Sequence, residues 1–82
     1  MSKTIVITGA SSGIGKATAK YFAENGWNVA ATMRKPESEK ELGDLANVRL
    51  YALDVTDTKQ VETAISRIKS DFGQIDVLFA KF

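Results

Sequence analysis

The chain has 82 residues, of which 44% are hydrophobic and 26% are charged, so we expect one globular domain with a small core and no second domain. It contains no Cys and no His, which excludes disulfides and thiolate or imidazole chemistry and leaves only carboxylates for a metal, so we expect no metal site. No apolar run approaches the ~18 residues of a membrane span. The net charge of +1 gives no reason to expect nucleic acid or a membrane as partner. The strand-like start of the chain favours a cytoplasmic location over a signal peptide.

The first half of the chain predicts two strands and one firm helix. Residues 4–8 are β-branched throughout and apolar on both faces at the centre, which is typical of a central parallel strand covered by helices on each side. Apolar or small residues then recur at helical spacing and predict a helix over about 13–24, ended by an Asn-Gly pair. Residues 27–32 predict a second strand, which ends before Pro36. Residues 38–46 are polar apart from two leucines and predict one short, frayed helix or a loop.

The second half continues the alternation. Residues 48–53 predict a third strand near a sheet edge. Asp57 with Gln60 three positions on forms a capping-box pattern, and residues 61–72 carry one apolar helical face. Residues 75–79 predict a fourth strand. The predicted fold is therefore α/β, a three-layer, doubly wound parallel sheet with strand order 3-2-1-4 and two or three helices.

A glycine-rich turn, TGASSGIG at residues 8–15, joins the first strand to the first helix. Its three glycines allow a sharp exit from the strand, close approach of the backbone to a phosphate, and close packing of helix on strand. A pyrophosphate placed at the helix N-terminus would gain hydrogen bonds and favourable electrostatics together. Nucleotide binding is the leading hypothesis, and the alternative is an ordinary strand-to-helix connection.

With its G-x-x-x-G-x-G spacing, this turn resembles the cofactor loop of the short-chain dehydrogenase/reductase family. The likeness extends over nearly all 82 residues, through the Asp54-Val55 pair after the third strand and residues 75–78 of the fourth. The resemblance implies a truncated Rossmann-type dinucleotide-binding domain over residues 1–82. The cofactor-binding residues that it implies are Gly9, Ser11, Ser12, Gly13, Ile14, Gly15, Arg34, Asp54 and Val55.

The resemblance favours NADP over NAD as the cofactor. Where NAD-using members carry an acidic residue that bonds the adenosine ribose, this chain has Met33, and Arg34 beside it can grip a 2′-phosphate. Ser12 stands where NADP-preferring members often carry a basic residue, so one of two markers is present. In the alternative reading, Arg34 is a solvated loop cation, Asp54 favours the turn, and Ser11 and Ser12 are turn formers or helix caps.

The match ends at residues 80–82, where the family continues with Asn-Asn-Ala-Gly. The family's catalytic Ser and Tyr-x-x-x-Lys have no counterpart, because Tyr21 is followed four positions later by Asn25, and Tyr51 by Val55. We therefore expect an NADP(H)-binding portion of an oxidoreductase that is inactive alone, self-associating as a dimer through the sheet edge after the fourth strand. The alternatives are one piece of a split oxidoreductase completed by another chain, and a non-enzymatic interaction module with a vestigial nucleotide site.

Overall fold

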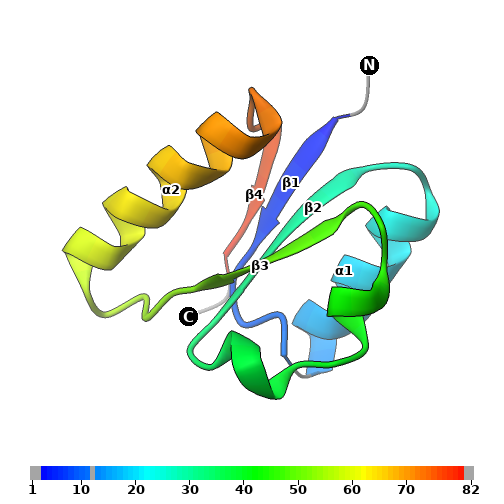
Figure 1. Cartoon of the computed structure of the whole chain (residues 1–82), viewed down its shortest axis with the longest axis horizontal. Helices are drawn as coiled ribbons and strands as arrows, with labels where there is room; N and C mark the ends of the chain where they lie inside the picture. Colours follow the sequence, from blue (N-terminus) through cyan, green and yellow to red (C-terminus); the bar gives the residue numbers. More distant parts are fainter. Residues whose placement is uncertain (1–2, 12, 81–82) are drawn as a thin grey trace.

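The computed structural model describes residues 3–11 and 13–80 and contains one four-stranded parallel sheet in the order β3-β2-β1-β4 (Figure 1). The strands are β1 (Thr4–Ile7), β2 (Asn28–Met33), β3 (Val48–Ala52) and β4 (Val77–Phe79), and the α-helices are α1 (Gly13–Glu24) and α2 (Thr58–Phe72). Ile5 of β1 lies between Val29 of β2 and Val77 of β4. The predicted fold class and strand order are confirmed.

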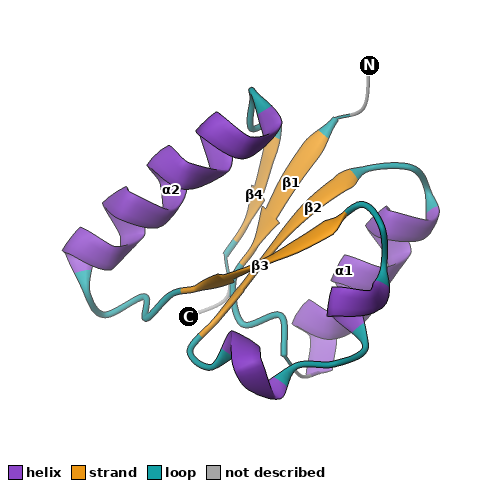
Figure 2. Cartoon of the chain, viewed as in Figure 1, coloured by secondary structure: helices purple, strands orange, loops and turns teal. Residues whose placement is uncertain are grey.

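The sheet is the middle of three layers, with α1 on one side and α2 on the other (Figure 2). Successive residues of a strand point to opposite faces. Accordingly, Ile5 and Ile7 of β1 join the cluster that includes Ala19 of α1, while Val6 between them joins the cluster that includes Ile68 of α2. Both faces of β1 are therefore buried, as its β-branched sequence predicts.

The start of α2 lies where the capping pattern predicts it. The Asp57 carboxylate accepts hydrogen bonds from the backbone N–H groups of Lys59 at 3.0 Å and Gln60 at 3.2 Å. The return bond of the capping box goes elsewhere, since the Gln60 side chain accepts from the backbone N–H of Asp54 at 3.0 Å.

No helix in the described part of the chain is long and apolar enough to cross a membrane, and the cytoplasmic location stays a prediction.

The connection between β2 and β3 differs from the single frayed helix or loop predicted over residues 38–46. Two short 3₁₀ turns form instead, η1 (Pro36–Ser38) and η2 (Leu42–Asp44). Pro36 suits the first position of such a turn because it needs no N–H partner there. Leu42 is fully buried in the α1-side cluster and anchors the second turn.

The fourth strand begins at Val77 rather than at residue 75. Asp76 still pairs with β1, because its carboxylate accepts the Thr4 N–H at 2.8 Å and its own N–H donates to the Thr4 carbonyl at 2.9 Å. A side chain thus replaces a backbone acceptor at that point, and the regular ladder starts one residue later. The second strand is shifted by one residue from the predicted 27–32, and the third ends one residue before the predicted 53.

Candidate functional site

A pocket of about 540 Å³ opens at the carboxyl ends of β1, β2 and β3. Its volume lies in the range of small-molecule sites, and in open α/β sheets ligands bind beyond the carboxyl ends of the strands. The lining residues come from the last residue of β2 and from the segments that follow these three strands: Gly9, Ser11, Met33, Arg34, Lys35, Ser38, Glu39, Leu53 and Val55. The site thus lies where the doubly wound topology predicts one.

The glycine turn has a backbone that other residues do not readily adopt. Gly9 has φ of 62° and Gly13 has φ of 58°, in the left-handed region. At Gly15 the restriction is space, because a Cβ there would lie 2.2 Å from the carbonyl oxygen of Gly9. The first turn of α1 therefore packs directly on the backbone that leaves β1. The Ala10 N–H donates to the Thr32 carbonyl at 3.1 Å and ties this turn to β2.

The pocket brings together four of the predicted site residues, Gly9, Ser11, Arg34 and Val55. The run from Gly13 to Gly15 lies in the first turn of α1, beyond Ser11, and is not part of the lining, and the side chain of Ile14 is largely exposed. Ser12 lies outside the described residues. The free N–H groups expected at a helix N-terminus make this edge of the pocket suited to an anion.

Arg34 and Asp54 meet across the ends of neighbouring strands. The Arg34 guanidinium lies 3.9 Å from the Asp54 carboxylate, but its side chain is 73% exposed, so the ion pair itself contributes little. The same carboxylate oxygen accepts from the Thr56 hydroxyl at 2.7 Å and the Thr56 N–H at 3.0 Å. These bonds, with the charge of Arg34, lower the pKa of Asp54. The Asp54 carboxylate thus stabilises the turn after β3, and its contact with a cofactor stays a prediction, while its neighbours Leu53 and Val55 line the pocket.

Five lining residues are not in the predicted set: Met33 and Leu53 at the ends of two strands, and Lys35, Ser38 and Glu39 in the segment after β2. The Glu39 side chain is only 4% exposed, and its carboxylate accepts the Leu42 N–H at 3.0 Å and pairs with the Lys16 ammonium at 3.3 Å. The hydrogen bond from Leu42, followed by that from Lys16, lowers the pKa of Glu39. For Lys35, Ser38 and Glu39, the signal available in the sequence was their place in a polar segment directly after β2, at the edge of the sheet where ligands bind.

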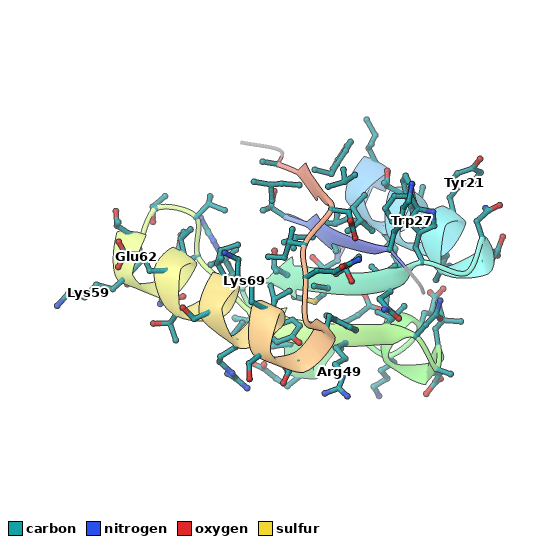
Figure 3. The ribbon with its side chains drawn as sticks, turned by 90° about the horizontal axis from the view of Figure 1, so that it is seen from above. Tyr21, Trp27, Arg49, Lys59, Glu62 and Lys69 are labelled. Carbon is teal, nitrogen blue, oxygen red and sulfur yellow. The ribbon has the colours of Figure 1, made fainter. Side chains whose placement is uncertain are left out.

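Neither tyrosine lines this pocket. Tyr21 points outward from α1 and is 62% exposed (Figure 3). The Tyr51 ring is buried on the α2 face, where its hydroxyl donates to the Asp71 carboxylate at 2.6 Å. Burial, followed by that bond, raises the pKa of Tyr51 well above its ordinary value. Tyr51 is therefore a structural group, although it also lines a smaller pocket of about 330 Å³ between β3 and α2.

The two sides of the main pocket together suit an extended, phosphate-bearing ligand. One side offers backbone at a glycine turn, and the other offers Arg34 and Lys35. A family model described as short chain dehydrogenase matches residues 3–81. The chain belongs to the short-chain dehydrogenase family. Its predicted likeness to that family is confirmed.

Among relatives in this family, the serine 3-dehydrogenase of Agrobacterium fabrum is 40% identical over 80 residues, which are 95% of this chain and 32% of that protein. The solved structure of ElxO with NADP bound is 42% identical with a TM-score of 0.84, over 95% of this chain and 34% of that one. The Brucella melitensis 3-ketoacyl-(acyl-carrier-protein) reductase complexed with NADH is 33% identical with a TM-score of 0.86, over 93% and 32%. The chain spans less than a third of the length of the first curated relatives it matches.

Proposed function

We propose that this chain is the NADP(H)-binding portion of a short-chain dehydrogenase oxidoreductase. The observation that carries the proposal is the pocket itself, in which a tightly packed glycine turn faces a basic segment at the end of β2. The structural neighbour ElxO, 42% identical, holds NADP. A bound nicotinamide dinucleotide supplies hydride transfer, and the protein supplies binding and orientation.

Different parts of the pocket would hold different parts of the cofactor. The backbone of the glycine turn, with the Ser11 hydroxyl, holds the pyrophosphate, and the close packing at Gly15 keeps the helix N-terminus against it. Val55 in the lining and Asp54 beside it in the chain would hold the adenine, and Arg34, which lies 3.9 Å from Asp54, would hold the 2′-phosphate. The full set remains Gly9, Ser11, Ser12, Gly13, Ile14, Gly15, Arg34, Asp54 and Val55.

NADP is favoured over NAD because of the end of β2. Met33, only 3% exposed, presents no carboxylate that would bond a free ribose or repel a 2′-phosphate. The Arg34 fork is exposed and tied only loosely to Asp54, so it is available to the phosphate. Because Arg34 is exposed to solvent, we expect its charged hydrogen bond to contribute at the lower end of the usual range. This corresponds to about tenfold tighter binding of NADP than of NAD.

Titration calorimetry with NADP⁺ and NAD⁺ tests this proposal. Wild type should bind NADP⁺ about tenfold more tightly, and Arg34→Ala should remove that preference. Arg67→Ala is the matched control, since it removes an arginine that lies over the Tyr51 ring on the α2 face of the sheet, outside this pocket. Equal affinities in wild type, or an equal loss of preference in the control, would contradict the proposal.

The proposal also includes self-association through β4. This strand ends the sheet, and Val77 and Leu78 are 40% and 57% exposed on it. An apolar edge strand offers free backbone groups to another strand. A second copy of the chain, paired symmetrically, would cover these side chains.

A further inference from the structure

We infer that the ion pair between Lys16 and Glu39 maintains the preference for NADP over NAD that the proposed function assigns to Arg34. The inference rests on the proposed function and adds two positioning residues to it. Neither residue needs to touch the cofactor. The pair acts on the pocket wall that carries Arg34 and Lys35.

The Glu39 carboxylate is fixed from two sides. One oxygen lies 3.3 Å from the Lys16 ammonium, and the other accepts the Leu42 N–H at 3.0 Å. Leu42 is fully buried, so this hydrogen bond anchors the carboxylate to the core of the α1 side. With 4% of its side chain exposed, Glu39 depends on these partners rather than on water.

The pair joins the two sides of the pocket. Lys16 follows Gly15 in the first turn of α1, directly after the glycine turn. Glu39 ends the segment that runs from β2 through η1, in which Arg34, Lys35 and Ser38 line the pocket. Lys16 therefore holds the basic segment at a fixed place relative to the glycine turn.

The pair also controls the charge of the pocket wall. Glu39 is the one carboxylate among the described residues that line the pocket. While Lys16 neutralises it, the wall presents the positive charges of Arg34 and Lys35. Without Lys16, a buried, uncompensated negative charge would face the ligand and repel a 2′-phosphate. NAD has only hydroxyls at that ribose, and any repulsion of the pyrophosphate is common to both cofactors.

A second lysine in the same network provides a matched control. Lys20 pairs with Glu41, which Lys16 also contacts at 3.2 Å. Glu41 is 61% exposed and does not line the pocket. Removing the charge of Lys20 therefore changes the network at its solvent side and leaves the pair with Glu39 in place.

The test measures the ratio of the NADP⁺ and NAD⁺ dissociation constants by calorimetry, with both cofactors titrated into one preparation of each variant. Lys16→Met should reduce the preference for NADP⁺ about tenfold, and Lys20→Met should change it less than about twofold. Adding Glu39→Gln to Lys16→Met removes the uncompensated charge and should restore most of the preference. The folded fraction cancels in the ratio, so partial unfolding of a variant does not imitate the effect.

The outcomes separate the two claims. If wild type binds neither cofactor or shows no preference, the proposed function fails and the inference falls with it. If wild type prefers NADP⁺ and loses that preference in Arg34→Ala, but Lys16→Met keeps it in full, only the inference is overturned. A Lys16→Met variant whose loss is not reduced by Glu39→Gln would also overturn it, because the charge of Glu39 would then not be the cause.

Discussion

Replacing Gly15 by alanine should destabilise the protein strongly, although alanine is the better helix former. The added Cβ would lie 2.2 Å from the Gly9 carbonyl oxygen, 2.9 Å from the Gly9 carbonyl carbon and 3.2 Å from the Ala10 Cα. All three are backbone atoms, so no flexible side chain can move aside. Overpacking typically costs 1–3 kcal/mol and occasionally more, against a gain of about 1 kcal/mol from helix propensity. With so close a contact we expect a net loss of about 2 kcal/mol in the free energy of unfolding.

Urea unfolding followed by circular dichroism measures this loss, which in a domain of this size corresponds to a lower Tm by roughly 10 °C. Gly43→Ala is the control, since the nearest atom to its Cβ would be a Leu50 methyl at 3.5 Å, an ordinary contact. Its free energy of unfolding should change by less than about 0.5 kcal/mol. If Gly15→Ala is as stable as wild type, the first turn of α1 does not pack on the glycine turn as described.

Three further predictions concern pH, association and turnover. Folding lowers the pKa of Glu39 from its ordinary value of 4.5. Its contribution to stability should therefore be complete above about pH 4.5 and be lost as the pH falls through the lower pKa of the folded state. Unfolding measured against pH should show a flatter acid limb in Glu39→Gln than in wild type. Sedimentation of the 82-residue chain should show concentration-dependent association that Leu78→Lys weakens, whereas an unchanged monomer in both would remove the role of the β4 edge. NADPH absorbance with a panel of aldehydes and ketones should show no turnover by these 82 residues. Neither tyrosine is placed to donate a proton at the pocket, because Tyr21 points outward and Tyr51 is buried against Asp71. Turnover above a heat-denatured control would contradict this prediction.

The parts of the fold that depend on local rules could be predicted from the sequence. The β-branched run of β1 indicates burial on both faces, and Asp57 marks the start of α2 through bonds within three residues of itself. The glycine turn could be recognised because Gly9 and Gly13 adopt conformations that few other residues share.

The remainder depends on contacts between distant residues. Lys16 and Glu39 are 23 positions apart, and nothing in the polar segment between β2 and β3 predicts that its carboxylate is buried and paired. The late start of β4 likewise follows from Asp76, which bonds Thr4 at the other end of the chain. Such pairs have no periodicity in the sequence, so local patterns leave them undetermined.

The central claim is that the pocket beyond β1, β2 and β3 holds NADP(H), and amide chemical-shift mapping of the isotope-labelled chain during titration with NADP⁺ tests it most directly. We predict that the largest shifts fall on Gly9, Ser11, Arg34 and Val55, which line that pocket. Saturating NADP⁺ that leaves these amides unchanged, or that instead shifts Thr63 and Arg67 in the smaller pocket beside α2, would contradict the account.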